Sequence, residues 1–489
     1  MPPPAGRDGA GTWTSPSDAR SIILAWARAR PPGRWSGEPT SLARVQWTID
    51  QVVALAPDPA AARAGRDQAD VRRWSALGRA EAAAWGECRG SAAQPYRTCL
   101  DTAEPAFGCS CPSRKLPCKH ALGLFLILAG QPGTIAEAAP PHWVAEWLAK
   151  RAERARKSAG PAAPAPAPAD PAAAAEEQAR RARRRQGRVA AGVEELALWL
   201  ADLVRNGLAD LPGRPRQFWS QPAARMVDAQ APGLARLVGE LAEVPHSGPA
   251  WPDRLLTRVG RLHLALEGYR RIETLPAPLR AELATVVGFT ESREAVSARG
   301  ERVAGRWLVL GRSIRQEERL RAQRTWLLEA ATGRPAMVLD HAAQQQPLDP
   351  SLVPGTAMDA ELAFYPAALP LRAVVVERGE ALALADRFPA EPTAAAALRG
   401  YAAALAANPW LELAPLAVRG VLPCREDAAW SLADAEGARL PLANETGGLV
   451  LLAVSGGRPI DVFGEWDGLA LTPLGAWADV AFSTIEAGP

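Results

Sequence analysis

Residues 109–120 read CSCPSRKLPCKH and place three cysteines and one histidine within twelve residues. Their order is C-x-C-x6-C-x-H, so Cys109, Cys111, Cys118 and His120 form one compact set of candidate ligands. Three thiolates and one imidazole nitrogen complete the tetrahedral shell of Zn²⁺ and leave no position for a catalytic water. The sequence therefore predicts a structural zinc site, not a catalytic one.

A disulfide framework is the competing interpretation of this cysteine cluster. Residues 1–11 lack the charged-then-apolar order of a signal peptide, and closely spaced cysteines in a reducing compartment bind metals more readily than they form disulfides. We therefore expect a cytoplasmic protein that binds zinc. Outside the motif, Cys88 and Cys99 could belong to a second site, but no other Cys or His pair stands near them. This isolation favours buried, inert thiols.

Positively charged side chains are interleaved with the ligands. Arg114, Lys115 and Lys119 lie among them, and this group holds two of the chain's four lysines. Such side chains bind phosphates with sequence-independent affinity, so the three residues are candidate nucleic-acid contacts. They could equally offset the negative charge that three thiolates and Zn²⁺ carry together. Both interpretations stay open from the sequence.

Short helices are predicted on both sides of the motif. Residues 121–129 form an apolar run that predicts a helix beginning near His120, and residues 48–56 and 71–85 predict two more. We interpret 47–149 as a zinc-binding module whose finger spans about 94–129. Residues 1–40 contain several prolines and little apolar sequence, which predicts a partly disordered extension.

A proline- and alanine-rich tract, residues 159–175, lies within a segment that has no apolar periodicity. We interpret residues 150–188 as a disordered linker, because such a composition favours extended, unpacked chain. The linker carries 11 lysines and arginines against four carboxylates, whereas the whole chain has a net charge of only +3. A basic tether of this kind could attract DNA phosphates or could be a solvated, charged linker.

The remaining sequence divides into a helical region at 189–290 and a mainly β region at 301–489. Apolar residues at helical spacing predict helices at 189–208, 223–243, 253–271 and 278–287. Strand patterns are found at 303–310, 325–329, 336–339, 371–377, 449–454 and 460–464, with a helix predicted at 393–407.

The motif and its surroundings resemble the SWIM zinc finger family, and in particular its bacterial members of this size. The resemblance rests on WGECRGS at 85–91, Pro95-Tyr96 and FGCSCPSRKLPCKH at 107–120, and more weakly on residues 191–211 and 225–235. It implies a ββα finger, zinc bound by Cys109, Cys111, Cys118 and His120, and a module that contacts DNA or other proteins without catalysing a reaction. Bacterial relatives are found beside MoxR-type ATPases and von Willebrand factor A proteins, which implies a partner of that kind.

Composition and missing motifs narrow the function. The chain has no Gly-Lys pair for a phosphate-binding loop, and it lacks His-Glu-x-x-His, Gly-x-Ser-x-Gly and Gly-x-Gly-x-x-Gly. No apolar run approaches the ~20 residues of a membrane span. We expect an α+β multi-domain, non-enzymatic protein with a ββα zinc finger, helical flanks, a disordered linker, a helical bundle and a mainly β C-terminal region. Its predicted role is that of a protein-interaction adaptor; the alternative is a DNA-binding protein that uses the finger and the basic linker.

Overall fold

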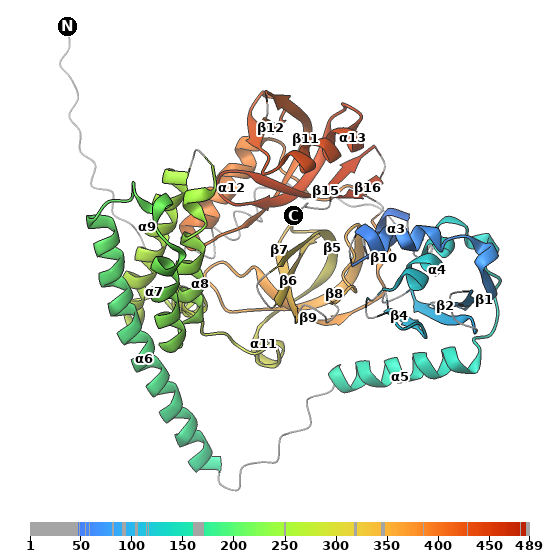
Figure 1. Cartoon of the computed structure of the whole chain (residues 1–489), viewed down its shortest axis with the longest axis horizontal. Helices are drawn as coiled ribbons and strands as arrows, with labels where there is room; N and C mark the ends of the chain where they lie inside the picture. Colours follow the sequence, from blue (N-terminus) through green and yellow to red (C-terminus); the bar gives the residue numbers. More distant parts are fainter. Residues whose placement is uncertain are drawn as a thin grey trace.

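The computed structural model describes residues 47–485, apart from residues 48, 54, 58, 81–82, 90–93, 103–105, 114, 116, 160–170, 249–250, 317–319, 344–347, 385, 428 and 480. The extension predicted at 1–40 lies outside the described residues. The chain is mixed α+β, as the sequence predicts. In Figure 1 the β-rich C-terminal region lies between a finger module, which includes α2 to α5, and a helical bundle, α6 to α10. None of the described helices is both long and apolar enough to span a bilayer.

The finger module is built on a four-stranded antiparallel sheet of order β1-β2-β3-β4. Its helix α4 covers one face of the sheet, and the sheet, α4 and α2 share one apolar core. The module consists of α2 (Ile49–Val53), α3 (Pro59–Asp67), β1 (Trp74–Ala80), β2 (Ala83–Cys88), β3 (Tyr96–Asp101), β4 (Ala106–Cys109), α4 (Lys119–Gly130) and α5 (His142–Ala159).

The helix predicted at 71–85 is wrong, because this segment forms strand β1 and the start of β2. The error has two physical causes: β1 has a bulge between Ser75 and Gly78, where Ala76 adopts a φ of +51°, and β2 is buried on both faces. Ala84 belongs to the core under α4, whereas Ala83 and Trp85 pack against Val144 of α5. A strand covered on both sides shows no alternation of apolar and polar residues, so its sequence resembles that of a buried helix.

The linker prediction needs correction at both ends. Helix α5 continues to Ala159, and helix α6 (Pro171–Arg205) begins inside the predicted linker, which leaves 160–170 outside the described residues. Alanine, arginine and glutamate are strong helix formers, and proline is well tolerated in a first helical turn. Glu177 also forms ion pairs with Arg180 and Arg181 one turn later. The composition that indicated disorder therefore also supports helix.

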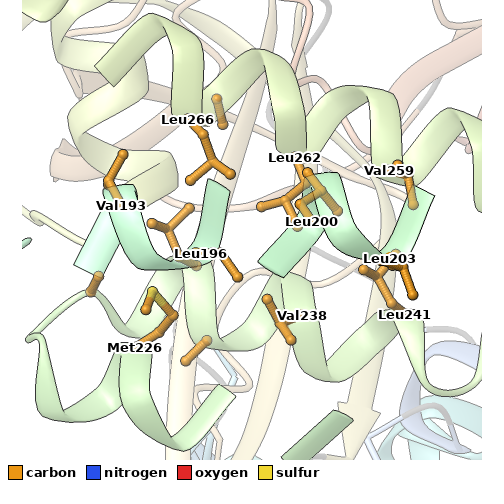
Figure 2. Packing of buried hydrophobic residues seen from close by; sticks show 14 of the residues in the cluster. Val193, Leu196, Leu200, Leu203, Met226, Val238, Leu241, Val259, Leu262 and Leu266 are labelled. Atoms are coloured by element: carbon orange, nitrogen blue, oxygen red, sulfur yellow. The ribbon is translucent and has the colours of Figure 1, made fainter. Parts of the chain in front are cut away.

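The helical bundle comprises α6, α7 (Arg216–Asp228), α8 (Pro232–Leu241), α9 (Trp251–Arg270) and α10 (Ala277–Val287). Figure 2 shows leucines of α6 packed against α9 on one side and against α7 and α8 on the other. The single helix predicted at 223–243 is in fact two helices, because Gln230 adopts a φ of +62°. The chain turns there so that Gly233 can approach α10, where a Cβ atom would lie 2.1 Å from the carbonyl oxygen of Val286.

The C-terminal region contains two sheets that follow the short helix α11 (Arg293–Arg299). Strands of the first sheet pair in the order β10-β8-β5-β6-β7-β9, and β9 also pairs with β8, so five of the strands close into a barrel. We call β5 to β9 the first barrel. Its strands are β5 (Glu301–Gln316), β6 (Leu320–Glu329), β7 (Pro335–Ala343), β8 (Thr356–Phe364) and β9 (Arg372–Arg378), with the short β10 (Leu382–Ala383) at the edge.

The second sheet has the order β13-β12-β11-β14-β15-β16, and a parallel bridge between Leu442 and Leu471 brings the end of β13 beside β15. We call β11 to β15 the second barrel. Its elements are β11 (Ala414–Glu426), β12 (Ala429–Ala433), β13 (Arg439–Pro441), α13 (Glu445–Ser455), β14 (Ile460–Trp466) and β15 (Leu471–Ala478); α12 (Ala394–Ala407) precedes it and β16 (Ala481–Thr484) follows it.

The strand predicted at 449–454 is wrong, because these residues lie in helix α13. The helix begins after Asn444, whose side-chain oxygen accepts a hydrogen bond from the Gly447 amide at 2.7 Å, and it ends at Gly456, whose φ is +55°. Asn and Gly are common residues at these two cap positions, so helix signals were present on both sides of the apolar run. The other predicted strands of this region and the helix at 393–407 are confirmed.

Candidate metal centre

The four predicted ligands are brought together by the β3–β4 hairpin and the start of α4. Cys109 is the last residue of β4, and Cys111 follows in the loop. Cys118 is the N-cap of α4, where its Sγ accepts a hydrogen bond from the Ala121 amide at 3.5 Å, and His120 lies in the first helical turn. The hairpin and helix form the ββα arrangement that the family resemblance implies.

The donor atoms have the spacing that a tetrahedral metal ion requires. The ligand atoms of Cys109, Cys111, Cys118 and His120 all lie within 4.8 Å of one another. Cys109 Sγ lies 3.8 Å from His120 Nδ1, close to the ~3.5–3.8 Å between ligands of a tetrahedral ion with bonds of about 2.0–2.3 Å. Cys118 and His120 are both 3% exposed. The four residues therefore fit a closed metal site, and the described part of the chain contains no other such group of three or more His, Cys, Asp or Glu.

The cysteines cannot all carry negative charge without a cation. Hydrogen bonding from Cys118, and then from His120 and Thr98, lowers the pKa of Cys109 to about 3 despite its burial. The same hydrogen bond to Cys109, together with burial, raises the pKa of Cys118. One sulfur thus holds the negative charge and its neighbour holds the proton. A metal ion would displace that proton, because the thiolate is the form that binds metal.

Two residues beside the ligands were given no role in the sequence analysis. Thr98 of β3 lies opposite Cys109 in the hairpin and places its Oγ1 3.2 Å from Cys109 Sγ. The Tyr96 ring lies 4.9 Å from the His120 ring, centroid to centroid. Residues of this kind orient ligands and tune the metal. The resemblance already included Tyr96, but only the register of β3 against β4 reveals Thr98.

The remaining cysteines upstream, Cys88 and Cys99, are buried thiols outside the ligand set, as predicted. Cys88 is fully buried, with its Sγ 3.6 Å from Gln68 Oε1, and Cys99 is 2% exposed. Burial raises the pKa of Cys88 to about 11 and that of Cys99 to about 12. Both groups are therefore neutral thiols at physiological pH. Neither belongs to a second cluster of metal ligands among the described residues.

The candidate nucleic-acid contacts are only partly described. Lys115 and Lys119 are exposed beside the ligands, whereas Arg114 lies outside the described residues. The positive charges of Arg73 and Lys119 also favour the ionised form of Cys88, against the larger opposing effect of its burial on the pKa. The two lysines are thus placed on the surface of the finger, where both interpretations of their role apply.

Comparison with protein families finds two matches. The SWIM zinc finger matches residues 108–129, from the residue before Cys109 to the end region of α4, and the SWIM-associated four-helix bundle domain matches residues 184–287. The chain thus contains a SWIM zinc finger and a SWIM-associated four-helix bundle domain. No curated protein and no solved structure matches it. The SWIM finger coincides with the ligand set, the SWIM-associated domain coincides with the bundle from within α6 to the end of α10, and neither match reaches the two barrels.

Proposed function

We propose that this protein is an adaptor that binds other proteins, that its SWIM finger holds one structural Zn²⁺, and that it catalyses no reaction. The observation that carries the choice of protein over DNA is the state of the basic side chains around residues 150–188. Binding to DNA phosphates requires lysine and arginine side chains that are free to displace the counterions condensed on the DNA. Most of the described cations in this segment instead contact groups of the chain itself.

The contacts of these cations support the proposal. Lys150 pairs with Glu146 at 2.6 Å, and Arg151 pairs with Asp101 at 3.1 Å. Arg180 and Arg181 both pair with Glu177. Two further arginines hold α6 against the bundle: Arg185 donates to the Gly288 carbonyl at 2.9 Å and stacks on Phe289, and Arg188 donates to Gln230 Oε1 at 2.8 Å. Their first role is to stabilise the fold.

Exposed apolar side chains on the bundle also favour a protein partner. Leu198 of α6 is 67% exposed, Val227 of α7 is 60% exposed and Leu256 of α9 is 64% exposed. Contiguous exposed apolar patches mark surfaces that other proteins cover, and these three side chains are the first positions at which to test for such a surface. A MoxR-type ATPase or a von Willebrand factor A protein is the first partner to test.

Zinc is the metal that the donor set favours. Three thiolates and one imidazole are the ligands of structural zinc sites, and soft thiolates discriminate against magnesium and calcium. Elemental analysis of the freshly purified full chain should give one zinc per chain. The variant Cys424→Ser, which changes a cysteine outside the cluster, should keep that ratio, whereas Cys111→Ser should lower it. A ratio near zero in folded wild-type protein would refute the zinc assignment.

A two-arm binding experiment tests the adaptor proposal. Purified chain is mixed with the MoxR-type ATPase or von Willebrand factor A protein of its own host and analysed by size-exclusion chromatography, while fluorescence anisotropy measures binding to duplex DNA. We expect a stable protein complex, and duplex binding no tighter than the ~10⁻⁴–10⁻⁶ M of non-specific contact. Absence of the protein complex together with nanomolar duplex binding would overturn the proposal.

Duplex DNA remains the second candidate because four exposed cations lie on or near the finger. Lys115 and Lys119 stand beside the ligands, and Arg73 and Arg89 are held next to each other by a backbone hydrogen bond of 2.9 Å. Nanomolar duplex binding that is lost in Lys115→Gln/Lys119→Gln would support this candidate. The matched control is Arg225→Gln, which removes a cation of the bundle that is paired with Glu195.

A further inference from the structure

The first barrel has the connectivity of an OB-type barrel. Numbered in chain order from β5, its strands close as 1-2-3-5-4-1, and the contact between the third and fifth strands is the one parallel pairing. The Met337 amide completes this contact by donating to the Leu371 carbonyl at 2.7 Å. OB-type barrels are five-stranded Greek-key barrels that bind oligonucleotides or oligosaccharides on the face of strands 2 and 3 and at the adjoining loops.

The second barrel repeats this connectivity. Strands β11 to β15 follow the same order, with the Leu442–Leu471 bridge as the parallel contact of strands 3 and 5. Helix α13 lies between its third and fourth strands. Two barrels of one connectivity in tandem indicate that the C-terminal region is a repeated binding scaffold. Fold alone does not define a ligand, so the ligand must be argued from side chains.

The two barrels cover part of each other's surface. Trp326 and Leu328 of β6 pack against Phe463 of β14 and Leu474 of β15 in one buried cluster. Glu465 of β14 also joins the two barrels, because its carboxylate accepts hydrogen bonds from Arg324 and Trp326 of β6. The outer face of β6 in the first barrel is therefore unavailable to a ligand. What remains open is the seam between β7 and β9, the third and fifth strands of the barrel.

A cavity of about 350 Å³ lies on this seam (Figure 1 shows β7, β9 and α11 there). It is lined by β7, by β9, by the connection between β8 and β9 and by the segment 290–293 that leads into α11. Its polar groups are Thr290, Arg293, His341, Tyr365 and Arg372, with Glu291 as the one carboxylate among the lining residues. The cavity has the size of a pocket for one nucleotide-sized group.

Two features of the lining select a ligand with both an aromatic ring and a phosphate. The Arg372 guanidinium lies over the Tyr365 ring at 4.3 Å from its centroid, so the lining contains a stacked pair of guanidinium and ring. Among the described residues, neither Arg293 nor Arg372 forms an ion pair within 4.0 Å, whereas Arg151, Arg180 and Arg181 of the linker do. Arg293 and His341 are exposed at the mouth. Aromatic rings and arginines together bind bases and phosphates of single strands.

We propose that the cavity at the β7–β9 seam of the first barrel binds single-stranded nucleic acid, with one nucleotide seated in the cavity. A neutral oligosaccharide would leave the lining with two arginines against the single carboxylate of Glu291. A duplex keeps its bases stacked and paired, so it cannot insert one of them into the cavity without unpairing it. The connectivity, the stacked Tyr365–Arg372 pair and the excess of arginine over carboxylate in the lining all point to the same ligand. This site is separate from the finger and does not depend on its metal.

Fluorescence anisotropy of the full chain with labelled oligo-dT of about 12 nucleotides tests the proposal, since one OB-type barrel covers ~4–16 nucleotides. Wild-type protein should bind the single strand more tightly than a duplex of the same length. Arg293→Gln changes an exposed side chain and should lower the salt slope by about 0.7. Tyr365→Leu should weaken binding about fivefold or more, as expected for loss of one stacked base.

Matched controls separate this site from other basic surfaces. Arg299→Gln changes an arginine in the last turn of the same helix, α11, that does not line the cavity. It should leave binding unchanged, as should Lys115→Gln/Lys119→Gln on the finger. The proposal is overturned if Arg293→Gln and Arg299→Gln behave alike, if only the finger variant loses binding, or if a neutral glucan oligosaccharide binds in place of oligo-dT. Circular dichroism confirms that each variant is folded.

Discussion

Replacing Cys118 by serine should unfold the finger and leave the bundle and both barrels folded. Cys118 has two roles, as a metal ligand and as the N-cap of α4, where its Sγ accepts a hydrogen bond from the Ala121 amide. Serine is among the best N-cap residues, so the substitution keeps the cap and removes the thiolate. The change in stability then reports the loss of the metal bond alone.

The expected magnitude follows from the number of ligands. Structural zinc contributes an apparent ~10–16 kcal/mol to the folding of small metal-dependent domains. Loss of one ligand in four removes at least about a quarter of this, roughly 2.5–4 kcal/mol, against the ~5–15 kcal/mol of a whole domain. A loss of that size lowers the ratio of folded to unfolded finger by about 100-fold or more. If the remaining three ligands lose the metal, the finger unfolds completely.

Hydrogen exchange measured by mass spectrometry on the full chain locates the effect. Peptides from α4 should lose at least about 100-fold in protection, while peptides from α9 and β14 keep theirs. The peptide that contains Val353 should lose protection together with α4. This residue of the C-terminal region is 1% exposed and belongs to the core of the finger module. Cys424→Ser is the control and should exchange like wild type. Wild-type protection of α4 in Cys118→Ser, or loss of protection throughout the barrels, would refute this reasoning.

Two further predictions concern cysteine reactivity and the contact between the barrels. With metal bound, a thiol reagent should label Cys424, and after chelation it should also label the ligand cysteines; Cys88 and Cys99 should react only on unfolding, because burial raises their pKa values to about 11 and about 12. Glu465→Leu should cost about 3–5 kcal/mol in denaturant melts, since it leaves Arg324 buried without its partner, whereas Leu at both positions should restore most of this. Burial opposes ionisation of Glu465, but Arg324, Trp326 and Ser313 lower its pKa below 4.5, so its contribution should be present above pH ~4.5 and lost as the pH falls through the lowered pKa.

The set of four ligands could be predicted because the ligands are local in sequence. Cys109, Cys111, Cys118 and His120 lie within twelve residues, and one hairpin and one helix start suffice to bring them together. The spacing of the four ligands in the sequence therefore determines almost all of the geometry of the site. The orienting contact from Thr98 was missed, because it depends on the register of β3 against β4, and register is set by tertiary burial.

Errors in the secondary structure arose where burial hides the local pattern. Strand β2 is covered on both faces, and α13 has an apolar run of the kind found in core strands. In the segment 150–188, alanine-rich sequence supports either an extended linker or a helix, and the ion pairs of Glu177 favour helix. In each case the deciding information lies in contacts or caps outside the periodic pattern itself.

The cavity on the first barrel could not be predicted, and its construction explains why. Its lining comes from four separate segments, around residues 290–293, 338–341, 365 and 372–374, and none of them carries a motif. They meet only because the parallel pairing of β7 and β9 closes the barrel, and that pairing joins residues about 35 positions apart, such as Met337 and Arg372. In a chain this rich in arginine, Arg293 and Arg372 are distinguished from the others by their shared place in the lining of one cavity. A binding residue of this kind is defined by its surroundings, so it becomes visible only when the strand order is known.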